Sequence, residues 1–194
     1  SKEVYRDFFR LRNGEMSDEE FSEKYHWERA ILSMDMTGFT ASAMRRGELQ
    51  SFLRIMDAQR VTIPVLREFG AEIIRCFADD IVAIFQDANA ALDAAFETHR
   101  RVRLFNDSTM STDYPTQCCA GIGFGRVFAI GPNSAQGDEM NRASKLGEDI
   151  ARANETLITE RAFAAVSSRD DVRFEPQDHD DQLFPFYRAS LRDA

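Results

Sequence analysis

The pattern of apolar and polar positions divides the chain into short strands and longer helices. Apolar runs with a two-residue period predict strands, over residues 27–34, 72–77, 81–85, 117–124, 126–130, 156–159, 172–174 and 184–191. Apolar residues at three- and four-residue spacing predict helices, over 40–47, 48–69, 88–105, 138–153 and 160–166. Strands that follow one another form hairpins and helices join the hairpins. This order predicts an α+β fold with an antiparallel or mixed sheet.

The N-terminal segment has a pattern of its own. Aromatic residues recur at helical spacing before a break at Asn13-Gly14. Ser17, with Glu20 three residues later, predicts a second helix with a capping box. We therefore expect a helical appendage over residues 1–26 and one folded domain over residues 27–194. The apolar stripe of the appendage is expected to pack on that domain or on a partner chain.

Composition and charge exclude several classes of protein. The chain is 43% apolar and contains 16 Phe, which must be buried, so it is not a collagen, a coiled-coil rod or a disordered tail. No apolar run approaches the roughly 18 residues that span a membrane, and the start has no signal-peptide pattern. A net charge of −9 gives no electrostatic footprint for nucleic acid. We expect a cytoplasmic protein that binds neither nucleic acid nor membrane.

The cysteines and histidines suggest no catalytic or zinc site. Cys76, Cys118 and Cys119 form an odd set, and neighbours in sequence rarely form a disulfide with each other. No histidine stands at a useful spacing from them for a zinc site. We therefore expect three buried, reduced thiols.

Carboxylates stand at the ends of two apolar strands. Asp35 ends the first strand and precedes Thr37-Gly38 and a helix start, so a carboxylate lies beside free backbone N–H groups. Such groups can hold Mg²⁺ and phosphate oxygens, although a helix-capping Asp is the ordinary alternative. Asp79 and Asp80 occupy the tip of a predicted hairpin, where Asp is also an ordinary turn residue. The carboxylates can form a two-metal site only if their strands are neighbours.

Two further motifs lie in the second half of the chain. The glycines of Gly121-Ile122-Gly123-Phe124-Gly125 precede a strand-like run, whereas a dinucleotide-binding turn requires a helix there. Glycines that let a strand bend or approach a ligand are the better interpretation. Asn141 and Lys145 share one face of a predicted helix. The alternative is a solvated face on which Lys145 pairs with Asp149.

Taken together, these motifs resemble the class III nucleotidyl cyclase catalytic domain, also called the adenylate/guanylate cyclase homology domain. The segments that carry the resemblance are Ser33–Thr40, Arg75–Phe85, Gly121–Val127 and Gly137–Leu146, and the match covers about residues 28–192. The resemblance implies a ferredoxin-like fold with a central, mostly antiparallel sheet. It also implies conversion of a nucleoside triphosphate to a 3′,5′-cyclic monophosphate and pyrophosphate, in a homodimer with shared active sites.

The resemblance implies a role for each residue of the metal and phosphate site. Asp35 and Asp79 would bind two Mg²⁺ or Mn²⁺ ions, and the Met36 carbonyl would add a ligand. Asp80 is the alternative to Asp79. Backbone groups of four successive residues would hold the phosphates: Thr37, Gly38, Phe39 and Thr40. Asn141 would orient the ribose.

Base recognition involves two further positions. Arg75 stands where adenylate cyclases have the lysine that reads adenine, and Ser134 is the candidate for the second base-reading residue. Arg75 alternates with Ile73 and Phe77, so we expect its face of the hairpin to be covered. Its fork of donors suits two adjacent acceptors, as on cytosine O2 and N3 or guanine O6 and N7. It could instead pair with an acidic neighbour. The family favours ATP narrowly, and GTP, UTP and CTP stay open.

The chain also departs from the family pattern. Ala78 and Asp80 flank Asp79 where the family usually has glycine and a small residue. Lys145 stands in place of an arginine that stabilises charge on the transferring phosphate, and a point charge is not equivalent to a bidentate fork. The segment 131–137 is short. Two alternatives therefore stay open: a catalytically silent cyclase-like module that binds nucleotide or dimerises, and metal-dependent phosphotransfer on another substrate.

Overall fold

The chain builds one mixed sheet in the computed structural model, which describes residues 2–37, 47–108, 115–131, 134–178 and 184–192. The strands are β1 (His26–Met36), β2 (Ile73–Phe77), β3 (Asp80–Phe85), β4 (Cys118–Gly131), β5 (Ser134–Gln136), β6 (Thr156–Thr159), β7 (Val172–Gln177) and β8 (Phe186–Leu191). Their order is β2-β3-β1-β4-β6-β8-β7, with β5 paired to β4. β4 and β6 are parallel and the other paired strands are antiparallel.

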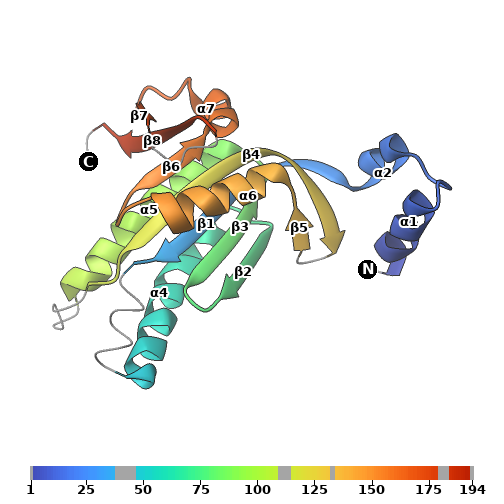
Figure 1. Cartoon of the computed structure of the whole chain (residues 1–194). Coiled ribbons are helices and arrows are strands. Elements are labelled where there is room, and N and C mark those ends of the chain that lie inside the picture. The colour runs from blue at the N-terminus through green and yellow to red at the C-terminus, as the bar shows by residue number, and fades with distance from the viewer. Residues whose placement is uncertain (1, 38–46, 109–114, 132–133, 179–183, 193–194) are drawn as a thin grey trace.

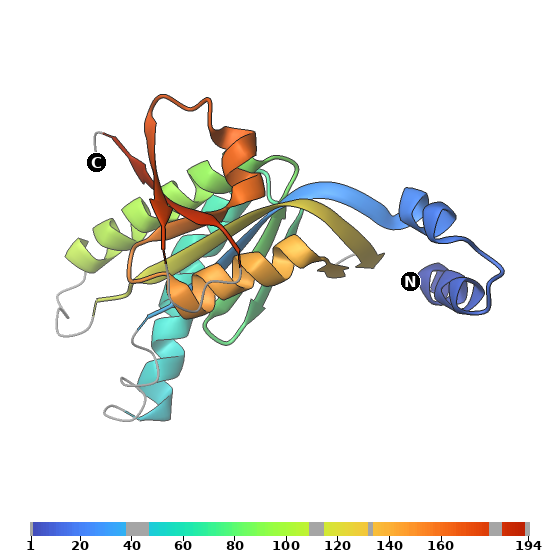
Figure 2. The same ribbon diagram turned by 45° about the horizontal axis from the view of Figure 1, so that its top comes forward.

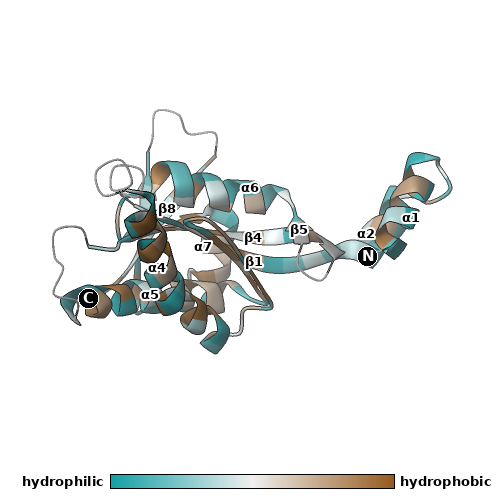
Figure 3. Cartoon of the chain, turned by 90° about the horizontal axis from the view of Figure 1, so that it is seen from below, coloured by the Kyte–Doolittle hydropathy of each residue, from teal (hydrophilic) through white to brown (hydrophobic). Residues whose placement is uncertain are grey.

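Helices cover both faces of this sheet. The helices in the described residues are α1 (Lys2–Arg12), α2 (Asp18–Tyr25), α4 (Glu48–Glu68), α5 (Ala88–Ser108), α6 (Asp138–Ser144), the π-helical turn η1 (Lys145–Ile150) and α7 (Glu160–Val166). α4, α5 and α7 lie on one face, and α6 with η1 lies on the other (Figures 1 and 3). None of the helices in the described part of the chain is long and apolar enough to cross a membrane. The predicted α+β fold with a mostly antiparallel sheet is confirmed.

The two faces of β1 serve different purposes. Ala30, Leu32 and Met34 belong to the main core, which lies between the sheet and the helices α4, α5 and α7. Ile31 is buried on the opposite face, where it packs in a smaller cluster with Ala143 of α6. Because side chains alternate along a strand, Asp35 lies on the face of α6. The central strand thus supplies core on one face and chemistry on the other.

Three elements differ from the predicted pattern. Residues 118–131 form one strand instead of two, because β1 pairs with β4 continuously from His26↔Phe128 to Met36↔Cys118. This pairing keeps the backbone extended through the glycines. The short strand β5 was not predicted. The helix predicted over residues 138–153 changes from α to π register at Lys145 and ends at Ile150. The helix predicted over residues 40–47 lies largely outside the described residues.

The N-terminal helices pack as a pair at the far end of β1 and β4 (Figure 2). Val4, Phe21 and Tyr25 are buried together, with Phe128 of β4 against them. Ser17 and Glu20 form the predicted capping box. β1 starts at His26, directly after α2, so no loop separates this helix pair from the central strand.

The glycines of β4 allow α6 and η1 to lie directly against the sheet. A Cβ at Gly121 would overlap the carbonyl oxygen of Ala143 and lie 2.5 Å from the backbone nitrogen of Gly147. A Cβ at Gly123 would overlap the carbonyl oxygen of Glu139. The close approach expected at these glycines is therefore made by a helix of the same chain and not by a ligand.

This packing predicts a large effect of one methyl group. Gly121→Ala should lower the free energy of unfolding by about 3 kcal/mol, because the methyl group would meet backbone atoms that cannot rotate away. The loss should appear in urea unfolding as a lower midpoint with an unchanged slope. A wild-type midpoint would contradict the contact between η1 and β4.

Candidate functional site

Three carboxylates meet where β1 ends and the β2–β3 hairpin turns. β1 pairs with β3 in a register that sets Met34 opposite Ile81, so the next pair brings Asp35 opposite Asp80. Asp79 occupies the adjacent turn. Each of the three side chains has an oxygen within 4.8 Å of those of the other two, and all three are half-buried. The condition that their strands be neighbours is met, and the cluster could hold a metal ion.

Without a bound cation, the negative charges of these carboxylates repel one another. Burial, together with the negative charges of Asp79 and Asp80, raises the pKa of Asp35 to about 6. Burial and the charge of Asp79 also raise the pKa of Asp80. Carboxylate oxygens are the hard ligands that Mg²⁺ and Mn²⁺ prefer, and a divalent cation would relieve this repulsion. The donor set therefore fits the metal ions expected from the sequence.

The turn that carries Asp79 has an unusual backbone. Ala78 has a φ of 52°, in the left-handed region that favours glycine. The side-chain amide of Gln59, on α4, donates to the Ala78 carbonyl oxygen at 3.0 Å. Residue 78 is the position where the chain departs from the glycine of the resembling family. The hydrogen bond from α4 thus helps to hold the turn in a backbone conformation that alanine does not favour.

We expect Ala78→Gly to stabilise the protein by about 0.5–1 kcal/mol, because glycine adopts this backbone without the steric penalty of a Cβ. Asn154, with a φ of 64°, offers a matched control. Asn tolerates the left-handed region better than Ala, so Asn154→Gly should gain less. Thermal unfolding of both variants measures the difference, and an equal or larger gain at position 154 would count against strain at Ala78.

A fourth carboxylate approaches the cluster from η1. Ser33 lies on the same face of β1 as Asp35, and its hydroxyl is 3.4 Å from Glu148 Oε1 and 3.3 Å from Ser144 Oγ. Burial and the charge of Asp80 raise the pKa of Glu148. The end of the helical segment α6–η1 is thereby fixed beside the acidic cluster. Sequence analysis missed Glu148, because it looks like an ordinary solvated helix residue.

The start of α6 is fixed by a buried carboxylate. Glu139 is 1% exposed, and its Oε2 accepts hydrogen bonds from Thr159 Oγ1 at 2.6 Å and from the Phe124 backbone nitrogen at 3.3 Å. These bonds tie α6 to β6 and β4. The exposed side chain of Asn141, two residues further along α6, is therefore carried on an anchored helix.

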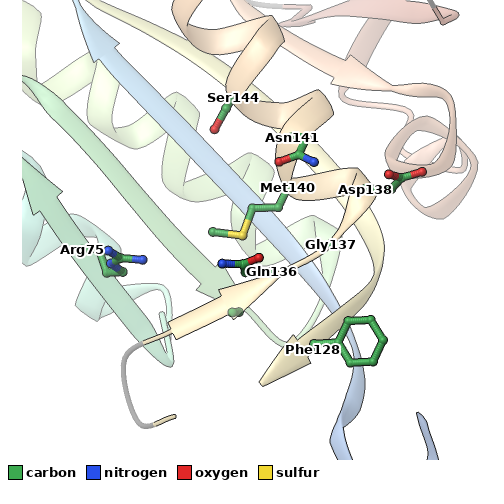
Figure 4. A pocket seen from close by; sticks show the side chains of 9 residues that line it. Arg75, Phe128, Gln136, Gly137, Asp138, Met140, Asn141 and Ser144 are labelled. Atoms are coloured by element: carbon green, nitrogen blue, oxygen red, sulfur yellow. The ribbon is translucent and has the colours of Figure 1, made fainter. Parts of the chain in front are cut away.

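A pocket of about 540 Å³ opens beside this helix start. Its walls come from β2, β4, β5 and α6, and Figure 4 shows the side chains that line it. Arg75 and Gln136 point toward each other across the pocket, Met140 lies beside Gln136, and Asn141 lies beyond Met140 on the same helix. The structure thus brings together Arg75 and Asn141, two of the residues singled out in the sequence. It adds Gln136, which the sequence analysis did not identify.

Arg75 is exposed at this pocket, so the expectation that its face of the hairpin is covered is wrong for the single chain. β2 is an edge strand of the sheet, and β3 is its neighbour in the described strand order. The Arg75 side chain forms no ion pair or hydrogen bond within the part of the chain that the structure describes. The acidic partner considered as an alternative is therefore not found among those residues. The neighbouring Phe77 is 83% exposed.

Lys145 behaves as the solvated-face alternative predicts. Its Nζ lies 2.7 Å from Asp149 Oδ2, and both side chains are exposed, at 43% and 57%. The pair spans the π-helical turn that begins at Lys145. Such turns inside helices are frequent at functional sites, but the ion pair alone assigns Lys145 no role.

The remaining residues singled out in the sequence lie partly where they were expected and partly elsewhere. Cys118 and Cys119 are buried as expected, whereas Cys76 is exposed because it lies on the edge strand β2. Thr37 follows β1, and its backbone nitrogen donates to the Gln117 carbonyl oxygen at 3.0 Å. Ser134 begins β5, two residues before Gln136. The other three residues expected to hold phosphate lie outside the described residues: Gly38, Phe39 and Thr40.

The fold is that of the class III adenylyl and guanylyl cyclase catalytic domains. No family model and no curated protein matches the chain, so this assignment comes from solved structures. The adenylyl cyclase CyaB from P. aeruginosa superimposes with a TM-score of 0.71 at 17% identity, over 87% of this chain and 98% of that one. The resemblance inferred from the motifs is thereby confirmed for the fold.

Two other solved structures show the same similarity. An adenylate/guanylate cyclase/hydrolase from Silicibacter pomeroyi matches with a TM-score of 0.71 at 23% identity, over 86% of this chain and 96% of that one. The guanylate cyclase domain of RhGC from Catenaria anguillulae, in complex with GTP, matches with a TM-score of 0.72 at 15% identity. That match covers 86% of this chain and 98% of the other.

Proposed function

We propose that the protein is a nucleotidyl cyclase that converts a nucleoside triphosphate to a 3′,5′-cyclic monophosphate and pyrophosphate. The observation that carries this proposal is the acidic cluster of Asp35, Asp79 and Asp80, within 4.8 Å of one another on a cyclase fold. Residues 27–194 would form the catalytic domain and residues 1–26 the helical appendage.

Asp35 and Asp79 would hold two Mg²⁺ or Mn²⁺ ions, with the Met36 carbonyl as a further ligand. When bound, the ions make the ribose 3′-hydroxyl a better nucleophile and the α-phosphate a better electrophile. Backbone groups of the segment from Thr37 to Thr40 would hold the phosphates, although the N–H of Thr37 itself already donates to the Gln117 carbonyl oxygen. Asp80 is the alternative ligand to Asp79, since its oxygens belong to the same cluster.

The pocket beside α6 would hold the nucleoside. The Asn141 amide can both donate and accept hydrogen bonds, so it can fix the ribose with its 3′-oxygen facing the α-phosphate. Lys145 would place positive charge near the transferring phosphate. It must give up part of its pairing with Asp149 to do so. Arg75 and Ser134 are the base-reading candidates from the sequence.

We further propose a homodimer in which each site takes its acidic cluster from one chain and its pocket from the other. Both features lie on the α6 side of the sheet, at the two ends of the α6–η1 segment. Phe77, 83% exposed beside this face, favours a covering partner. A head-to-tail pair related by a two-fold axis would form two identical sites.

The test is incubation of the purified protein with ATP, GTP, CTP or UTP and Mn²⁺ or Mg²⁺. Cyclic monophosphate and pyrophosphate in equal amounts, identified by chromatography and mass spectrometry, are the expected products. Absence of product with all four triphosphates would overturn the proposal. Nucleotide binding without turnover would favour the silent module, for which the pairing of Lys145 with Asp149 is the specific observation.

A further inference from the structure

Two side chains with complementary hydrogen-bonding ability face each other in the pocket beside α6. Arg75 projects from β2 and Gln136 from β5, and each points toward the other across the space between them (Figure 4). Neither side chain makes a hydrogen bond or an ion pair with the residues that the structure describes. Their polar groups are therefore available to a ligand in a pocket of about 540 Å³.

The two side chains would form hydrogen bonds with different groups on a base. The Arg75 guanidinium is a donor only, and its fork matches two adjacent acceptors. The Gln136 amide adds an acceptor oxygen as well as two N–H donors. A base that satisfies both residues therefore needs a pair of adjacent acceptors for Arg75 and an N–H group for Gln136.

Adenine and uracil do not provide this combination. Adenine pairs the acceptor N7 with the donor N6 on one edge, and its ring nitrogens N1 and N3 are separated by a C–H group. In uracil the two carbonyl oxygens are separated by an N–H donor. Either base would leave part of the Arg75 fork unpaired, and a donor from which a bound base excludes water is costly to leave unpaired.

Guanine and cytosine both provide adjacent acceptors and a donor. They differ in whether these groups lie on one edge of the ring or on two. Cytosine has its acceptors O2 and N3 and its donor N4 along one edge, so both residues would have to reach the same side. Guanine has the acceptors O6 and N7 on one edge and the donors N1 and N2 on the next. Since Arg75 and Gln136 lie on facing walls (Figure 4), guanine fits better.

We propose that Gln136 is a base-reading residue of this site and that, with Arg75, it selects guanine. This inference rests on the proposed nucleotide site and narrows its substrate to GTP, in place of the ATP favoured narrowly by the resemblance. It also moves the second base contact from Ser134 to Gln136, two residues further along β5.

The test compares substrate preference in the wild type and in Gln136→Met, which keeps the length of the side chain but loses its hydrogen bonds. Two measurements are made on the full chain: the ratio of kcat/KM for GTP to that for ATP, and calorimetric binding of 3′-deoxy-GTP and 3′-deoxy-ATP with Mn²⁺. The 3′-deoxy nucleotides lack the attacking hydroxyl, so binding is measured without turnover. Gln177→Met, the same change on β7 away from the pocket, is the control.

The wild type should prefer the guanine nucleotide in both measurements, and Gln136→Met should reduce that preference about tenfold or more. Gln177→Met should leave it unchanged. A wild-type preference for adenine or a pyrimidine would overturn the choice of guanine. An unchanged preference in Gln136→Met, or a shift only in Ser134→Ala, would overturn the role of Gln136. If guanine binding depends on Gln136 but no cyclic product forms, the proposed activity fails and this inference stands.

Discussion

Asp79→Asn and Asp35→Asn should each lower Mn²⁺-dependent formation of cyclic nucleotide by about a thousandfold, because metal activation contributes several kcal/mol to such reactions. Asparagine keeps the size of the side chain but removes the charge that attracts a divalent ion. Asp107→Asn, an exposed position at the end of α5, should leave the rate unchanged. The assay is initial velocity at saturating triphosphate. A wild-type rate in Asp35→Asn would refute the metal assignment.

Asp79 and Asp80 can be separated by the same comparison. If Asp79 is the ligand, Asp80→Asn should retain most of the activity, and the reverse result would identify Asp80. Titration with Mn²⁺ distinguishes a weakened site, which higher metal concentrations rescue, from a lost one.

Asp79→Asn should stabilise the metal-free protein although it lowers the activity. The folded state raises the pKa of Asp35 from 3.8 to about 6, so the folded protein binds more protons than the unfolded chain between these values. Stability in chelator should therefore fall as the pH rises through this range. Asp79→Asn removes one of the repelling charges, so its melting temperature in chelator at neutral pH should exceed that of the wild type. Adding Mn²⁺ should reverse the order.

Mixing two inactive variants should restore activity. Asp79→Ala removes the acidic half of a shared site and Asn141→Ala removes the pocket half. An equimolar mixture gives about half heterodimers on simple statistics, each with one intact site, so about a quarter of wild-type activity should return. Initial velocity after the chains have exchanged is the measurement.

Two controls make the mixing result decisive. Each variant incubated alone at the same total concentration should stay inactive. A mixture of Asp79→Ala with Asp35→Ala, both in the acidic half, should also stay inactive because neither heterodimer site is complete. If heterodimers form, as judged by co-purification of differently tagged chains, and no activity returns, each chain contains its own complete site.

The sequence predicted features that depend on local pattern. Asp35 at the end of an apolar run and Asp79 in a hairpin turn are visible as motifs, because strand ends and turns follow from nearby residues. Their proximity depends on the pairing of β1 with β3, which joins residues that are 47 (Met34 and Ile81) to 55 (Ala30 and Phe85) positions apart. Such a long-range pairing is not visible in the sequence, so the metal site could be predicted only on the condition that these strands are neighbours. The fold was predictable because several such motifs occur in order.

Other parts of the candidate site could not be predicted in the same way. Gln136 lies on a strand of three residues, which is too short to show a period of two. Glu148 lies in the π-helical segment that follows Ser144, and the change from i→i+4 to i→i+5 hydrogen bonding leaves no mark on composition. The exposure of Arg75 depends on its position in an edge strand, which is a property of the sheet order and not of the hairpin itself.

Core side chains and the Asp35 carboxylate point to opposite faces of β1, and this alternation limits how the gene can change in length. Deleting or inserting one codon between Ala30 and Asp35 would turn the Asp35 carboxylate toward α4 and α5 and bring Met34 to the acidic face. Every pairing with β3 and β4 beyond the change would shift with it. Insertions and deletions among descendants of this gene should therefore occur outside the central strand, where a shift of one residue does not exchange the side chains of two faces.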